Sequence, residues 1–161
     1  MKRLLLLFAC LILGACAGNP PLPQEVPPLQ LPMTLHVQRE QAGQSQDWLL
    51  VIQREDQRLR WSLMDLLGIP QARQLLADGQ WQADGLLPPN PAARELFAAL
   101  LFALTPTQRL TALYPAAQQQ DNRRWLGERW QVSYRQADEF TLNLQQGLRY
   151  QVTPLPGENP P

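Results

Sequence analysis

The sequence predicts a mainly β (α+β) domain, in which a curved antiparallel sheet or unclosed β-barrel carries two helices against its concave side. Two stretches, 29–83 and 130–153, show the apolar–polar alternation of half-buried strands. A helical period lies between them, from residue 90 onward. Because the strands cluster on both sides of the helical region, a parallel sheet of alternating strands and helices is poorly supported.

The first stretch is typical of an antiparallel meander. Apolar and polar residues alternate in the first and third of three successive runs, whereas the second is apolar on both faces, and polar turns around Gly43 and Asp56 separate the runs. The first and third runs should therefore bury one face and expose the other. The three runs lie at residues 29–37, 48–52 and 59–63.

A hairpin follows the meander. Asp78-Gly79 is the strongest hairpin signal in the chain, because both residues tolerate positive φ. It joins a segment at 72–77 to a short strand at 80–83. Between the meander and this hairpin, residues 64–70 break the alternation and are predicted to form a turn.

The period then changes to that of a helix. Asn90 can cap the helix and Pro91 suits its first position. Residues 105–108 have the pattern of a capping box and predict a second short helix. A polar loop is expected at 116–124, before three more alternating runs at 130–134, 140–144 and 148–152. The apolar face of the first helix comprises Leu96, Phe97, Leu100, Leu101 and Leu104.

The N-terminus has the features of a secretory signal. Two basic residues precede ten uncharged, mostly apolar ones, the last of which begins the tetrapeptide Leu13-Gly14-Ala15-Cys16. This tetrapeptide resembles the bacterial lipobox, which implies that residues 1–15 are removed and that Cys16 is lipidated. Ala17 resembles the residue that follows the cysteine in outer-membrane lipoproteins, which implies a lipid-anchored domain that faces the periplasm. The alternative is a soluble secreted protein that happens to carry Cys16.

Composition limits the remaining possibilities. Without Lys2 and Arg3, 12 of the 14 basic residues remain against 14 acidic ones, a net charge of about −2, so nucleic acid is not an expected partner. A single histidine, His36, makes a metal site improbable, and no cofactor motif appears. None of the serines lies in a nucleophile motif, so no enzymatic activity is expected. Residues 16–28 predict a proline-rich tether, and residues 154–161 predict a disordered tail.

The turn Asp65-Leu66-Leu67-Gly68 and the strand order around it resemble the LolB family over residues 29–153. Members are outer-membrane lipoproteins that accept other lipoproteins from a periplasmic LolA-like carrier and insert them. The chain is most similar to small LolB-like lipoproteins of poorly characterised function, often encoded beside aryl-polyene or fatty-acid-like synthesis genes. Leu66 stands where the family has proline, and the domain is shorter. Dedicated transport of one lipid or lipidated product therefore fits at least as well as general lipoprotein insertion.

The resemblance implies a membrane-insertion loop at Leu66, Leu67, Gly68 and Ile69, with Leu67 as the protruding residue. The alternative is that these aliphatic side chains fold back onto the core. Gly68 and Pro70 favour a sharp turn that projects its tip, and so favour exposure.

The resemblance also implies an apolar cavity for acyl chains. The predicted wall consists of apolar positions on the early strands and the first helix. The alternative is a filled core in a structural or accessory lipoprotein of an envelope assembly, without a ligand cavity. A monomer is expected in either case. The predicted wall residues are Trp48, Leu50, Trp61, Leu63, Phe97, Leu101 and Leu104.

Overall fold

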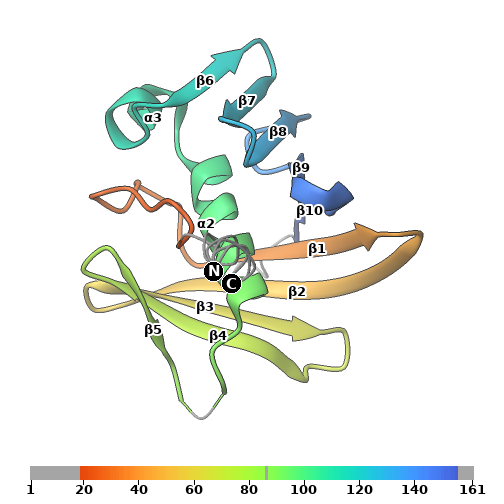
Figure 1. Ribbon diagram of the computed structural model, residues 1–161. Coiled ribbons are helices and arrows are strands. Elements are labelled where there is room, and N and C mark those ends of the chain that lie inside the picture. Colours follow the sequence, from red (N-terminus) through yellow and green to blue (C-terminus); the bar gives the residue numbers. More distant parts are fainter. Residues whose placement is uncertain (1–18, 86, 156–161) are drawn as a thin grey trace, which may run out of the picture.

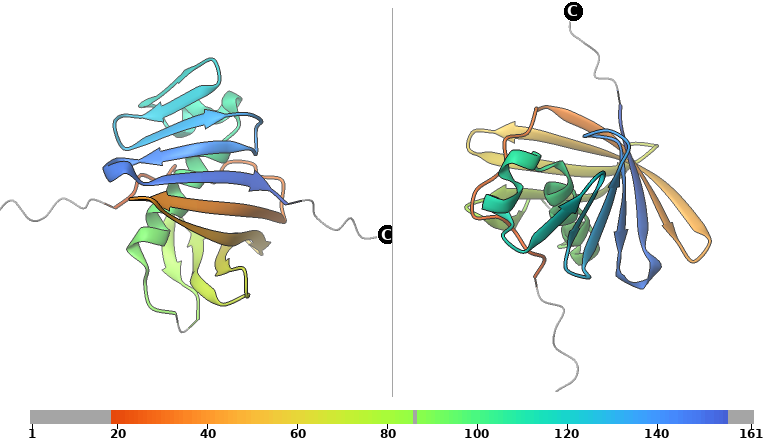
Figure 2. Two further views of the ribbon diagram at one scale, coloured as in Figure 1. Left: turned by 90° about the vertical axis from the view of Figure 1, so that its right-hand side faces the viewer. Right: turned by 90° about the horizontal axis from the view of Figure 1, so that it is seen from above.

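The computed structural model describes residues 19–85 and 87–155. They form one antiparallel sheet of ten strands, which curves around two helices and leaves β5 and β6 as free edges (Figure 1, Figure 2). The predicted fold class is therefore confirmed. The strand order is β5-β4-β3-β2-β1-β10-β9-β8-β7-β6. The strands are β1 (Met33–Gln41), β2 (Gln44–Glu55), β3 (Arg58–Asp65), β4 (Pro70–Ala77), β5 (Gln80–Ala83), β6 (Ala117–Gln120), β7 (Arg123–Leu126), β8 (Trp130–Tyr134), β9 (Phe140–Leu144) and β10 (Arg149–Pro154).

The first and last strands join the two halves of the sheet. β1 pairs with β10, so that Val37 lies opposite Val152, and on its other side β1 pairs with β2, where Trp48 lies opposite Val37. Val37 and Val152 are both buried. The apolar side chains of the alternating pattern, from strands in both halves of the sheet, therefore lie in a single core.

The helix α2 (Pro91–Leu104) lies across the concave face of the sheet (Figure 2). Asn90 caps it as predicted: its Oδ1 accepts a hydrogen bond from the N–H of Ala93 at 3.0 Å. The helix is apolar on most of its circumference, which is typical of a helix buried in a core. Its buried residues are Ala93, Leu96, Phe97, Ala98, Ala99, Leu100, Leu101, Phe102 and Ala103.

The second helix, α3 (Thr107–Leu113), forms as predicted, but its capping box was wrong. Pro106 occupies the cap position and no side chain caps the helix. The hydroxyl of Thr105 instead donates to the carbonyl oxygen of Leu101, at 2.7 Å, in the preceding helix. The threonine therefore serves the end of α2 and not the start of α3.

The polar loop predicted at 116–124 was also wrong, because most of it is the hairpin of β6 and β7. Gln120 lies opposite Arg123, and Asp121 in the turn has a φ of 52°. The side chains of β6 are exposed or partly buried, so no apolar alternation marks the strand. Backbone pairing, which leaves no trace in a hydrophobicity pattern, decides the structure here.

The ends of the domain differ slightly from the prediction. β1 begins at Met33, and Leu29 and Leu31 precede it as irregular chain packed against the core. β10 extends to Pro154, and the N–H of Leu155 donates to the carbonyl oxygen of Thr34 at 3.0 Å. Residues 156–161 of the predicted tail lie outside the described residues.

Residues 19–32 lie along the domain without forming a helix or strand. Pro23 and Pro27 are buried, Leu22 packs against the core, and Glu25 pairs with Arg109 of α3 at 3.1 Å. Much of the segment expected to be a free tether is therefore in contact with the folded domain. Residues 1–18, which include the predicted signal and Cys16, lie outside the described part of the chain.

Candidate functional site

The turn between β3 and β4 carries three exposed aliphatic side chains. Leu66 is 62%, Leu67 86% and Ile69 54% exposed. The alternative in which these residues fold back onto the core therefore does not hold. Large apolar side chains gathered at one exposed tip are typical of a binding or membrane-contact surface.

The carboxylate of Asp65 holds this turn together. Its Oδ1 accepts hydrogen bonds from the N–H groups of Leu67 and Ile69, both at 2.9 Å. The backbone closes the turn as well, since the N–H of Gly68 donates to the carbonyl oxygen of Asp65 at 3.0 Å. Gly68 has a φ of 81°, where a side chain would be strained. The leucines are thus presented by an ordered turn.

The predicted wall residues do come together, but as a packed core. Trp61 and Phe97 are fully buried with ring centroids 5.4 Å apart, and Leu101 is fully buried beside them on α2. Leu50 and Leu63 are equally inaccessible, while Trp48 and Leu104 are partly buried and pack against the same cluster.

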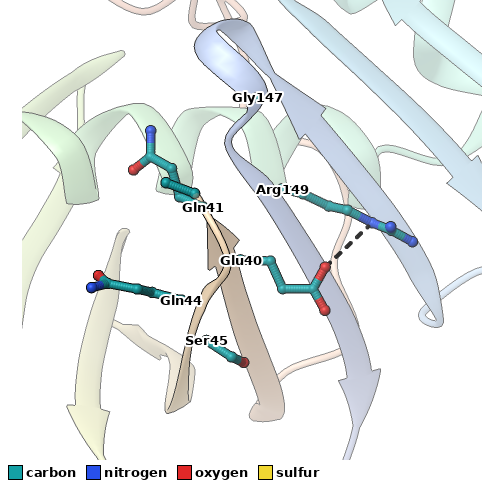
Figure 3. A pocket seen from close by; sticks show the side chains of 8 residues that line it. Glu40, Gln41, Gln44, Ser45, Gly147 and Arg149 are labelled. Carbon is teal, nitrogen blue, oxygen red and sulfur yellow. Dashed lines mark ion pairs between the residues drawn. The ribbon is translucent and has the colours of Figure 1, made fainter.

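Three hollows lie away from these residues. One, of about 370 Å³, lies at the β1–β2 turn, where Glu40 and Arg149 form an ion pair at 3.9 Å (Figure 3). Its other lining residues are Gln41, Ala42, Gly43, Gln44, Ser45 and Gly147. Two others, of about 380 and 700 Å³, lie beside Trp130 on β8 and beside Arg94 at the start of α2. None of these three is lined by the seven wall residues. Five of the seven have at most 2% of their surface accessible, as expected of a filled interior.

An ionic cluster fixes the first half of α2 to the sheet. Arg129 donates to both carboxylate oxygens of Glu95, at 2.8 and 2.6 Å, and the indole N–H of Trp130 donates to the same carboxylate at 2.7 Å. Burial opposes ionisation of Glu95, but the hydrogen bonds from Arg129 and Trp130 outweigh it. The pKa of Glu95 therefore lies below its ordinary value.

A buried arginine fixes the other end of the helix. Arg124, 3% exposed, donates to the carbonyl oxygens of Phe102 at 3.0 Å and Thr105 at 2.8 Å. Its guanidinium also lies 5.3 Å from the ring centroid of Tyr134. Burial lowers the pKa of Arg124, and burial raises the pKa of Tyr134 to about 12. A cation at the carbonyl end of a helix is favourable, so Arg124 stabilises the end of α2.

The sequence did not reveal either set of contacts that holds α2, those of Glu95 or those of Arg124. Arg124 lay in the supposed polar loop, and Glu95 and Arg129 are 34 residues apart, so no local pattern connects them. The one usable signal was that Glu95 and its neighbour Arg94 are charged residues in the first turns of a helix whose remaining residues are apolar.

Neither a metal centre nor a membrane-spanning helix is found in residues 19–85 and 87–155. No three histidine, cysteine or acidic side chains are grouped closely enough to hold an ion, and no helix there is both long and apolar enough to cross a bilayer. His36 contacts Asp47, with Nε2 and Oδ1 at 2.8 Å, on the outer face of the sheet.

Comparison of the chain with protein-family models and with curated proteins gives no match. The resemblance to the LolB family therefore stays a prediction.

Proposed function

We propose that the protein is a lipoprotein anchored in the outer membrane through Cys16, facing the periplasm. It accepts or inserts a lipid, a lipidated product or a lipoprotein there, received from a LolA-like carrier or a similar donor. The observation that carries this proposal is the ordered turn with exposed Leu66, Leu67 and Ile69. Burying one such leucine in the membrane boundary contributes about 1–2 kcal/mol, enough to orient an anchored domain but not to hold a free one.

The interior supplies the second part of the proposal. The acyl chain would occupy the space between the concave face of the sheet and α2, where Leu50, Trp61 and Leu101 now pack together. Binding thus requires separation of α2 from the sheet, because close packing leaves no room for a chain.

The membrane contact can be tested with a fluorophore. A lipidated Cys16 leaves the mature chain without a free thiol, so Leu67→Cys can be labelled alone with an environment-sensitive dye. We expect a blue shift of its emission when the lipoprotein is reconstituted into vesicles of phosphatidylethanolamine and phosphatidylglycerol. Gln57→Cys, in the exposed turn between β2 and β3, is the matched control and should keep its emission in water. Equal shifts at both positions, or none at Leu67→Cys, would contradict the proposed contact.

The anchor has its own test. Cys16→Ser should abolish incorporation of labelled fatty acid and leave an uncleaved or soluble form. Unchanged labelling and membrane attachment would refute lipidation at Cys16.

A second function is supported by the filled interior. In this alternative the protein is a structural or accessory lipoprotein of an envelope assembly, and the seven wall residues only stabilise the fold. Native mass spectrometry after mild extraction distinguishes the two functions. Co-purified acyl lipid supports transport, whereas a clean protein mass with a stoichiometric partner supports the structural role.

A further inference from the structure

Two tryptophans in the core bury indole N–H groups without an acceptor. Among the described residues, no hydrogen-bond partner lies within reach of Nε1 of either Trp61 or Trp81. Trp130 behaves differently, because its N–H donates to Glu95 at 2.7 Å. Buried polar groups are nearly always hydrogen-bonded in folded proteins, so two exceptions in one place require an explanation.

The two tryptophans belong to one aromatic cluster. The ring centroids of Trp61 and Trp81 are 5.7 Å apart at an interplanar angle of 88°, and both rings contact Phe97, at 5.4 and 5.7 Å. An edge-to-face pair can direct an N–H at a ring face, which is a weak hydrogen bond. Only one ring of such a pair presents its edge to the other, so this contact satisfies one donor at most.

Packing alone does not explain the choice of tryptophan over an apolar aromatic residue. Phenylalanine, as at Phe97, fills a core without adding a donor. A buried donor without a partner lowers stability, so keeping two suggests that they bind an acceptor supplied by another molecule.

We propose that the indole N–H groups of Trp61 and Trp81 bind the carbonyl oxygen of a neutral acyl ester, whose hydrocarbon chain lies between α2 and the sheet. This inference rests on the proposed acyl-binding function and specifies the chemical group that is recognised. The site offers donors, and an ester carbonyl offers acceptor lone pairs without a charge.

Charge excludes the free fatty acid as the preferred ligand. Arg60, the cation next to Trp61 in sequence, points to the opposite face of β3 and pairs with Glu55 and Asp84. On the inner face, Arg94 already donates to Gln74, the residue opposite Trp61 in β4, at 3.3 Å. A carboxylate beside the two tryptophans would have to break this bond to gain a counter-ion and would otherwise be buried unpaired, which is unfavourable. An alkane would leave both donors unsatisfied.

The free edge of the sheet gives access to this cluster. Trp81 lies on β5, a four-residue strand that pairs only with β4 and forms the outer edge (Figure 1). Trp81 is partly buried, whereas Trp61 is fully buried behind it. Because β5 has a neighbour on one side only, we place the opening for the ester between β5 and α2.

The test compares three ligands of equal chain length on the mature lipoprotein, held in a fluorinated surfactant whose tails mix poorly with hydrocarbon. Methyl palmitate, palmitate and hexadecane are titrated, and binding is followed by native mass spectrometry and tryptophan emission. We expect methyl palmitate to bind at least about tenfold more tightly than hexadecane, because one hydrogen bond supplies about that ratio and the carbonyl would accept two. Palmitate should bind more weakly than its ester.

Removal of each donor gives the matched variants. Trp61→Phe and Trp81→Phe should reduce the ester-to-alkane ratio toward one, and Trp125→Phe, on the distant strand β7, should leave it unchanged. Because the ratio is taken within each variant, a general loss of packing affects both ligands and cancels.

The outcomes separate this inference from the proposed function. If the wild type binds the ester and the alkane equally, or both phenylalanine variants keep the wild-type ratio, the indole N–H groups do not recognise the carbonyl oxygen. Neither result contradicts the proposed acyl-binding function. Palmitate that binds as tightly as its ester overturns the preference for a neutral group. A wild type that binds none of the three ligands refutes the acyl-binding function itself.

Discussion

Leu67 and Leu101 are the same residue type in opposite surroundings. Leu101 is fully buried at the centre of α2, and the helical period of its neighbours accounts for that position. Leu67 is 86% exposed at the tip of the β3–β4 turn, and nothing in the packing of the domain requires an aliphatic side chain there. An exposed leucine that the fold does not need, on a turn that the fold holds in place, is typical of a surface that contacts another molecule or a membrane.

The β3–β4 turn and α2 are also similar in how they are held in place. In each, polar side chains hold the backbone that carries the apolar residues. Asp65 orders the turn, and Glu95 and Arg124 fix the two ends of α2. This division predicts that polar and apolar substitutions will have different effects in the two regions.

The largest expected effect comes from placing a charge in the interior. Leu101→Arg buries a cation without a partner in the core, which should destabilise the domain by more than about 4 kcal/mol and prevent folding at 37 °C. Circular dichroism and thermal melting measure this loss. Leu67→Arg is the matched control and should melt within a few degrees of the wild type. A folded, stable Leu101→Arg domain would show that the interior is open to solvent, as in a cavity.

The second effect concerns Arg124 and its hydrogen bonds to the end of α2. Arg124→Met should lower stability by about 2–4 kcal/mol, because the carbonyl groups of Phe102 and Thr105 lose their buried donor. Arg123→Met, an exposed neighbour on the same strand, controls for the loss of charge and should be close to neutral. Equal denaturation midpoints for the two variants would mean that Arg124 does not hold the helix.

The sequence predicted most of the fold because most of the fold follows a period. Alternation located the strands with one buried face, and Asn90 and Pro91 located the start of α2. The prediction from sequence was wrong at β6 and β7, where exposed glutamines of β6 pair through the backbone. It was also wrong at Thr105, whose hydroxyl had two possible partners. Local rules cannot choose between such alternatives, since the choice depends on residues distant in sequence.

The candidate site was predicted unevenly for the same reason. The tip of the turn was identifiable because Leu66 and Leu67 contradict the polar composition expected of a turn. Whether the seven wall residues enclose a space or fill it depends on how closely α2 approaches the sheet. That distance depends on the packing of α2 against the sheet and on the contacts of Glu95 and Arg124, whose partners lie about 20 to 34 residues away in sequence.

A smaller effect concerns pH. The pKa of Glu95 in the folded protein lies below the ordinary value of 4.5, so the folded state binds this proton less tightly than the unfolded state. Its contribution to stability is therefore complete above about pH 4.5 and is lost as the pH falls through the lower, folded-state pKa. Glu95→Gln should be less stable than the wild type at neutral pH and should lose less stability on acidification. Parallel stability curves from pH 7 to pH 3 would contradict this linkage.

The smallest expected change in stability is at Leu67, and it is the one that separates the two regions most directly. Leu67→Glu places a charge in water, since the side chain is 86% exposed and its N–H remains bonded to Asp65. The free energy of unfolding should change by less than about 0.5 kcal/mol. Delivery of an acylated cargo to acceptor vesicles should nevertheless fall, because the glutamate cannot enter the apolar boundary of the bilayer without a large desolvation penalty. Leu67→Met keeps an apolar tip and should retain delivery, while Gln57→Glu adds the same charge at another turn and should also retain it. A large drop in melting temperature for Leu67→Glu would show that Leu67 is buried, as Leu101 is. Full delivery by a stable Leu67→Glu protein would show that the turn takes no part in delivery.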